Sequence, residues 1–367
     1  MTTDFRALAR AGVRTLAPYV PGKPVEELQR ELGLERIIKL ASNENPLGAS
    51  PAVSEALQRV WKDVGRYPDG NGFALKAALS AFLDVPSECL TLGNGSNDVL
   101  ELLARTFVDH DDEVVFSQHA FAVYPLVTQA VGGRPVMVPA QDYGHDLAAM
   151  AAAVTDRTRL MFIANPNNPT GTWVGRGVLE QLLAAVPEQV IVVLDEAYFE
   201  YVEEADYPNG LTLLDRHPNL VVTRTFSKIF GLASLRVGYG VASATITDLL
   251  NRVRQPFNVN AYAQAAAIAA LRDNDFLAES RRVNREGMRQ LAEGLRTLNL
   301  SAIPSVGNFI TFHVDDAARI YDQLLRRGII VRPVASYDIP DGLRVTIGTA
   351  QENRVFLSAL EEILAGH

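Results

Sequence analysis

Short apolar runs alternate with amphipathic stretches along the first two thirds of the chain. Seven runs rich in leucine and β-branched residues predict strands, at residues 90–92, 113–117, 134–138, 160–164, 190–194, 220–223 and 237–241. The run at 190–194 is continuously apolar, as expected for a parallel strand that is buried on both faces. Because helical stretches separate many of these runs, the pattern predicts an α/β fold with a mostly parallel sheet and helices on both faces.

The last third of the chain predicts a smaller α/β domain. An alanine-rich segment at 261–271 and a charged helix at 276–298 lead into it. Its own elements are expected at residues 303–314, 317–327 and 343–347. We therefore expect three parts. Residues 1–38 form an N-terminal arm that packs with the small domain, residues 39–258 form a large domain, and residues 259–367 form a small C-terminal domain.

Composition and charge narrow the class of protein. The 367 residues are 48% apolar, which is enough for a large buried core, yet no run approaches the roughly 20 apolar residues of a membrane-spanning helix. A net charge of −9 without a basic block argues against nucleic acid as a partner. One cysteine excludes an internal disulfide, and six scattered histidines show no metal-ligand spacing. We expect a cytoplasmic protein without a metal site.

The sequence around Lys228 gives the strongest indication of chemistry. An apolar run at 219–223 leads into Thr-Phe-Ser-Lys at 225–228, and Arg236 follows eight residues after the lysine. A lysine that forms a Schiff base must be neutral part of the time, so it needs a desolvated site flanked by cations. Ser227 and Arg236 offer a hydroxyl and a guanidinium fork, which are groups suited to a phosphate dianion. The combination is typical of a pyridoxal 5'-phosphate site.

A carboxylate ends the preceding predicted strand. Asp195 follows the apolar run at 190–194, and Tyr198 comes three residues later. Active sites of open α/β sheets form at the carboxyl ends of strands, and pyridoxal chemistry needs an acid that keeps the pyridine nitrogen protonated. We expect Asp195 to be this acid and Tyr198 to bond the phenolic oxygen of the ring. An aspartate that only caps a turn is the alternative.

Two further turn segments supply polar groups. Asn168 lies in the stiff turn Asn-Pro-Asn-Asn-Pro-Thr-Gly, where its amide is a neutral donor for the same phenolic oxygen. Gly95, Ser96 and Asn97 begin an amphipathic helix, whose N-terminal N–H groups favour an anion, although such residues also simply cap helices. The glycines do not fit G-x-G-x-x-G, so a nicotinamide dehydrogenase is not supported.

These segments resemble fold-type I aminotransferases of class I and II over nearly the whole chain. Within that superfamily, four segments resemble histidinol-phosphate aminotransferases, at residues 16–19, 40–48, 66–69 and 343–349. The resemblance implies the two-domain α/β architecture, pyridoxal 5'-phosphate as cofactor and a homodimer. It also implies histidinol phosphate or imidazole acetol phosphate and glutamate or 2-oxoglutarate as substrates, in histidine biosynthesis.

The resemblance gives individual residues a role in cofactor binding. Lys228 would form the imine, Asp195 would pair with the pyridinium, and Asn168 and Tyr198 would donate to the phenolic oxygen. The residues expected around the cofactor phosphate are Gly95, Ser96, Asn97, Ser227 and Arg236. Tyr67 resembles a tyrosine that such dimers lend to the partner's cofactor phosphate, and Phe121 stands where the family stacks an aromatic ring, often a tyrosine.

The resemblance also assigns the substrate-binding residues. Arg344 matches the arginine that grips the α-carboxylate of glutamate, and Arg332 occupies the position that contacts the substrate phosphate. Tyr19 is expected to donate a hydroxyl to that phosphate, and Asn43 is expected to contact the substrate.

Three other interpretations stay open. An aromatic amino-acid aminotransferase would leave Arg332 without a substrate ligand, and a phosphothreonine decarboxylase would use the same lysine, aspartate and arginines. A protein that keeps the fold without catalysis is disfavoured, because each position to which the resemblance assigns a chemical role holds a suitable residue.

Overall fold

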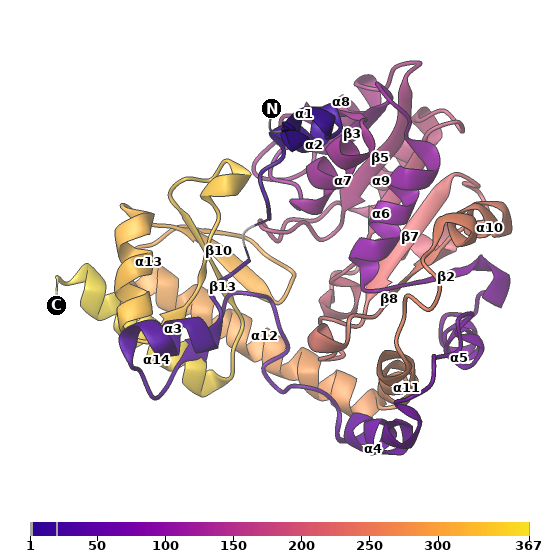
Figure 1. Cartoon of the computed structure of the whole chain (residues 1–367). Helices are drawn as coiled ribbons and strands as arrows, with labels where there is room; N and C mark the ends of the chain where they lie inside the picture. Colours follow the sequence, from indigo (N-terminus) through magenta and orange to yellow (C-terminus); the bar gives the residue numbers. More distant parts are fainter. Residues whose placement is uncertain (1–2, 20, 367) are drawn as a thin grey trace.

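A sheet of seven strands forms the centre of the large domain (Figure 1). The computed structural model describes residues 3–19 and 21–366. The strand order is β2-β8-β7-β6-β5-β3-β4, with bounds β2 (Leu90–Gly93), β3 (Glu113–Ser117), β4 (Arg134–Val138), β5 (Thr158–Ala164), β6 (Ile191–Asp195), β7 (Leu220–Thr225) and β8 (Gly238–Val241). Only β8 runs antiparallel to its neighbours β7 and β2, and the pairs from β7 to β4 are parallel. The predicted strands and the mostly parallel sheet are confirmed.

Strand β6 shows why these apolar runs form the centre of the sheet. All five of its residues are buried. Val193 packs in a cluster with residues of α6, α7 and α10, whereas Val192 and Leu194 pack on the opposite face with residues of α8 and α9. These helices are α6 (Ser96–Phe107), α7 (Val123–Val131), α8 (Leu147–Ala152), α9 (Arg176–Ala185) and α10 (Ala244–Val253). Because successive side chains of a strand point to opposite faces, a strand covered by helices on both sides is apolar throughout.

The small domain contains an antiparallel sheet of order β12-β13-β10-β9. Its strands are β9 (Ala302–Ile303), β10 (Phe309–His313), β12 (Arg332–Pro333) and β13 (Gly342–Thr346). The helices that share its hydrophobic core are α12 (Asn274–Thr297), α13 (Ala317–Arg326) and α14 (Ala350–Leu364). A separate parallel pair joins β1 (Ile38–Lys39) to β11 (Ile329–Ile330), which ties the N-terminal arm to this domain.

The N-terminal arm contacts both domains. Helix α3 (Val25–Leu32) buries Leu28 against Ala41 and Ile330, so this part packs with the small domain. The preceding helices, α1 (Phe5–Leu8) and α2 (Ala11–Thr15), lie over the large domain, as Figure 1 shows. A β-carbon at Gly12 would lie 2.0 Å from the backbone oxygen of Gln129, which is why α2 can approach α7 only with a glycine there.

The core of the large domain extends beyond the expected boundary at residue 259. Helix α11 (Ala261–Ala270) packs against α4 (Pro51–Val60) and α5 (Phe73–Leu83) and shares their core, which continues to Leu277. Farther along α12, Leu291 and Leu295 belong to the core of the small domain. We propose that the change from one domain to the other takes place within α12. Within residues 3–19 and 21–366, no helix is both long and apolar enough to cross a membrane.

Candidate active site

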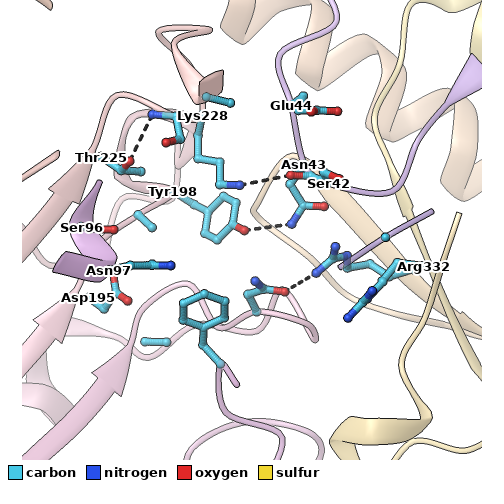
Figure 2. Close-up of a pocket in the computed structure, with 18 of the residues that line it drawn as sticks. Ser42, Asn43, Glu44, Ser96, Asn97, Asp195, Tyr198, Thr225, Lys228 and Arg332 are labelled. Atoms are coloured by element: carbon cyan, nitrogen blue, oxygen red, sulfur yellow. Dashed lines mark hydrogen bonds between the residues drawn. The ribbon is translucent and has the colours of Figure 1, made fainter. Parts of the chain in front are cut away.

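A cavity of about 270 Å³ lies between the two domains, at the carboxyl ends of the central strands (Figure 2). The large domain, the small domain and the arm all contribute to its lining. The predicted site residues that the structure brings together there are Tyr19, Asn43, Ser96, Asn97, Phe121, Asn168, Asp195, Tyr198, Ser227, Lys228, Arg236, Arg332 and Arg344. Gly95 lies next to Ser96, whereas Tyr67 does not line the cavity and is 82% exposed.

Lys228 reaches into the cavity from the loop after β7. Its Nζ donates to the backbone oxygen of Ser42 at 3.2 Å, a contact drawn in Figure 2. Burial lowers the pKa of Lys228 to about 7, and the nearby cations of Arg344 and Arg236 add to this effect, while Glu44 opposes it. The amine is therefore neutral for a large share of the molecules at neutral pH, as a nucleophilic lysine requires.

We expect the reactivity of Lys228 in cofactor-free protein to rise with a midpoint near pH 7. The sign follows from deprotonation, because only the neutral amine attacks an acylating reagent and its fraction grows as the pH passes the pKa. Peptide mass spectrometry of briefly labelled protein would measure this. An exposed lysine such as Lys62 is the control, and a midpoint for Lys228 near that of the control would contradict the assignment.

Asp195 is buried at the end of β6, between β5 and β7. Its Oδ2 accepts from the hydroxyl of Tyr124 at 2.9 Å, and its Oδ1 accepts from Thr223 Oγ1 at 3.1 Å. Desolvation raises the pKa of Asp195 to about 6, and these two hydrogen bonds hold it down from a higher value. At neutral pH the carboxylate is thus mostly ionised, so it can accept a proton or pair with a cation.

The hydroxyl of Tyr198 faces the same cavity. Asn43 Nδ2 donates to this hydroxyl at 2.8 Å, so the oxygen already has a donor and its own proton is available to an acceptor. Burial raises the pKa of Tyr198 to about 12, which keeps the proton in place. Arg344 Nη1 donates to Oδ1 of Asn168, and the Nδ2 donor of that amide therefore points away from the arginine. Both side chains line the cavity and each keeps a proton that it can donate there.

The start of α6 and the segment after Lys228 form a concave group of donors. Gly95 has φ +78°, and a β-carbon there would lie 2.5 Å from Arg236 Nη2. The glycine therefore lets the guanidinium approach the first turn of the helix, where Ser96 is buried. Arg236 Nη1 also donates to Ser227 Oγ at 3.2 Å. Hydroxyls, a guanidinium and a helix N-terminus together fit the phosphate dianion of pyridoxal 5'-phosphate.

Two arginines enter the cavity from facing positions of the small-domain sheet. Arg332 of β12 and Arg344 of β13 are paired directly across the two strands. Arg344 Nη2 donates to the backbone oxygen of Ala41 at 2.7 Å, and its buried Nε has no hydrogen-bond partner among the described residues. The guanidinium of Arg332 lies 5.7 Å from the ring centre of Tyr19. Like charges opposite one another destabilise a sheet, so the pair is suited to binding anions.

The family model for aminotransferases of class I and II matches residues 35–360. The chain belongs to this family. A protein of Pseudomonas fluorescens named histidinol-phosphate aminotransferase 2 is 58% identical over 368 residues, with all of both chains covered. The protein of the same name from Pseudomonas aeruginosa is 58% identical, with 99% of each chain covered.

A solved structure resembles this aminotransferase over almost its full length. It is the histidinol-phosphate aminotransferase from Sinorhizobium meliloti in complex with pyridoxal-5'-phosphate. It is 29% identical, has a TM-score of 0.90 and covers 97% of each chain.

Several residues that line the cavity or contact its side chains were not predicted from the sequence. The backbone oxygen of Ser42 accepts a hydrogen bond from Lys228, and the hydroxyls of Tyr124 and Thr223 donate hydrogen bonds to the carboxylate of Asp195. Tyr337 lines the cavity beside Arg332. A backbone acceptor leaves no signal in the residue type, and Tyr124 looks like any aromatic residue on an amphipathic helix. Thr223 could have been found, because it lies on the strand that leads to Lys228.

Proposed function

We propose that this aminotransferase transfers an amino group between histidinol phosphate and 2-oxoglutarate, with pyridoxal 5'-phosphate as its cofactor, in histidine biosynthesis. The observation that carries the substrate assignment is the facing pair of Arg332 and Arg344 in the cavity. One cation suits the carboxylate of glutamate and the other suits the phosphate of histidinol phosphate. The names of the relatives at 58% identity support the same activity.

The residues around the cavity suit the separate parts of the cofactor. Ser96, Ser227 and Arg236 would hold its phosphate, with Gly95 and Asn97 at the same helix start. When bound, pyridoxal 5'-phosphate supplies an aldehyde that exchanges with amines and a ring that accepts electrons.

Side chains at the base of the cavity would then act on the ring and the substrate. The Asp195 carboxylate would hold a proton on the ring nitrogen, and Tyr198 and Asn168 would donate to the phenolic oxygen. Phe121 would cover one face of the ring. Lys228, whose amine is neutral in a large share of the molecules near pH 7, would take a proton from the carbon that bears the amino group and return it elsewhere.

Substrate binding would use the two arginines in turn. Arg344 is fixed by Ala41 and Asn168, so its guanidinium is already oriented for a carboxylate. Arg332 lies beside Tyr19 and Tyr337, which offer hydroxyl donors for a phosphate. Histidinol phosphate has a phosphate and no carboxylate, and glutamate has carboxylates and no phosphate. Two cations side by side allow both substrates to use one cavity.

Acceptor profiling with glutamate as the donor would test the proposed function. We expect imidazole acetol phosphate to be converted with a higher specificity constant than phenylpyruvate. A preference for phenylpyruvate would favour the aromatic amino-acid aminotransferase, and release of carbon dioxide from phosphothreonine would favour the decarboxylase.

We also propose that the chain forms a homodimer with shared sites. Large apolar side chains stand exposed around α4 and α5, namely Trp61 at 68%, Val64 at 58%, Tyr67 at 82%, Phe73 at 78% and Phe257 at 44%. The rings of Tyr67 and Phe257 stack with centres 4.8 Å apart, which presents Tyr67 on this surface. A patch of this kind is typical of an interface between subunits. Tyr67 would reach the cofactor phosphate of the partner.

Mixed dimers test whether Tyr67 acts across the interface. Tyr67→Ala and Lys228→Ala should each lose activity, and the hybrid should contain one intact site. After random exchange in an equal mixture, half of the dimers are hybrids, and each hybrid has one working site out of two. The mixture should therefore regain about one quarter of the wild-type activity. Activity assays after subunit exchange, with hybrids confirmed by tagged purification, would measure this. No recovery would place Tyr67 outside the partner's site.

A further inference from the structure

Tyr124 connects Asp195 with the aromatic residues on one side of the proposed cofactor ring site. The side chain is completely buried within α7, and its hydroxyl donates to Asp195 Oδ2 at 2.9 Å. Its ring stacks on Phe162 with centres 4.5 Å apart and an angle of 6° between planes. It also meets the ring of Phe121 edge-on, at 5.9 Å and 88°. One side chain thus contacts both the residue expected over the ring face and the acid expected at the ring nitrogen.

The surroundings of Asp195 explain why this hydroxyl has a chemical effect. Each carboxylate oxygen has one side-chain donor among the described residues, Thr223 for Oδ1 and Tyr124 for Oδ2. The backbone N–H of Ala197 adds a third hydrogen bond, whereas the neighbouring charge of Glu196 favours protonation of Asp195. A buried carboxylate that loses a donor becomes easier to protonate. A protonated carboxyl group is a poor partner for a pyridinium N–H.

We infer that Tyr124 is a positioning residue that keeps the Asp195 carboxylate ionised and oriented toward the ring nitrogen of the cofactor. The inference rests on the cofactor site described under the proposed function. Burial raises the pKa of Tyr124 well above its ordinary value, so the phenol keeps its proton at neutral pH and can donate it to Asp195. Thr223, Tyr124 and the backbone of Ala197 use three of the roughly four lone-pair sites of the Asp195 carboxylate, which leaves about one for the cofactor.

Tyr124→Phe removes only the hydroxyl. The ring contacts with Phe162 and Phe121 remain, and the backbone oxygen of residue 124 still accepts from Thr128 Oγ1, at 2.8 Å in the native protein. The substitution therefore separates the hydrogen bond from the packing of the aromatic cluster.

The test compares the affinity of the cofactor-free protein for two compounds. One is pyridoxal 5'-phosphate, and the other is 1-deazapyridoxal 5'-phosphate, in which carbon replaces the ring nitrogen. The native protein should prefer the first compound. Tyr124→Phe should bind pyridoxal 5'-phosphate about tenfold more weakly, the effect of one hydrogen bond to a charged group, and should bind the analogue unchanged. Equal weakening for both compounds, or no change for either, would overturn the inference.

Two control variants make each outcome decisive. Asp195→Ala should abolish the preference for pyridoxal 5'-phosphate. If it keeps the preference, the role of Asp195 in the proposed function fails, and the inference fails with it. If Asp195→Ala loses the preference while Tyr124→Phe keeps it, only the inference fails.

Tyr262→Phe also removes a buried hydroxyl, one without a partner among the described residues, and should change neither affinity. The preference is the ratio of two affinities measured on the same preparation. A lower fraction of folded protein affects both measurements equally and leaves the ratio unchanged.

Discussion

Lys228→Ala is expected to lower the rate of amino transfer by roughly 10²–10⁴-fold or more, because in the proposed function Lys228 is the group that moves the proton. It should also lose the cofactor that borohydride reduction fixes to the protein. Lys228 is the lysine of the cavity, and its pKa of about 7 suits both tasks. Steady-state assays and mass spectrometry of the reduced protein would measure the two effects.

A lysine elsewhere in the molecule serves as the control for this prediction. Burial also lowers the pKa of Lys76, which lies in α5 outside the cavity lining. Lys76→Ala should keep the fixable cofactor, because Lys76 does not line the cavity although its pKa is also lowered. Cofactor still fixed covalently in Lys228→Ala would contradict the assignment.

Arg344→Ala and Arg332→Ala are expected to separate the two half-reactions. The loss of a hydrogen bond to a charged group costs roughly 1.5–3 kcal/mol, or about ten- to hundredfold in specificity constant. Arg344→Ala should impair glutamate and aromatic amino acids most, since both carry the α-carboxylate. Arg332→Ala should impair histidinol phosphate by this amount and unphosphorylated amino acids far less. Pre-steady-state absorbance of each half-reaction would measure the losses.

The central sheet could be predicted from the sequence because each of its strands has a local signal. Residues 113–117 and 134–138 were predicted with the bounds that β3 and β4 have in the structure. Both are short and mostly apolar, with Val-Val-Phe in the first and Val-Met-Val in the second, and Asp-Asp or Gly-Gly comes directly before them. The signal for each strand is therefore local. The order of the strands is not local information, since it depends on which crossovers place β5 between β3 and β6.

The candidate site was predictable wherever a residue stands in a distinctive motif. Asp195 ends strand β6, Asn168 and Lys228 follow strands β5 and β7, and the sheet brings these three strand ends to one edge. The pairing of Arg332 opposite Arg344 was not predictable, because it depends on the register of β12 against β13. Contacts that join distant segments, such as Tyr124 with Asp195, leave no pattern in the sequence at all.

The most direct test of the substrate assignment is single-turnover spectroscopy with histidinol phosphate and with histidinol, its unphosphorylated counterpart. The wild-type protein should react with histidinol phosphate at a specificity constant at least about tenfold higher, and Arg332→Ala should lose that preference. Equal losses for both amines in Arg332→Ala, or no preference for the phosphate in the wild type, would contradict the assignment and favour an aromatic amino-acid aminotransferase.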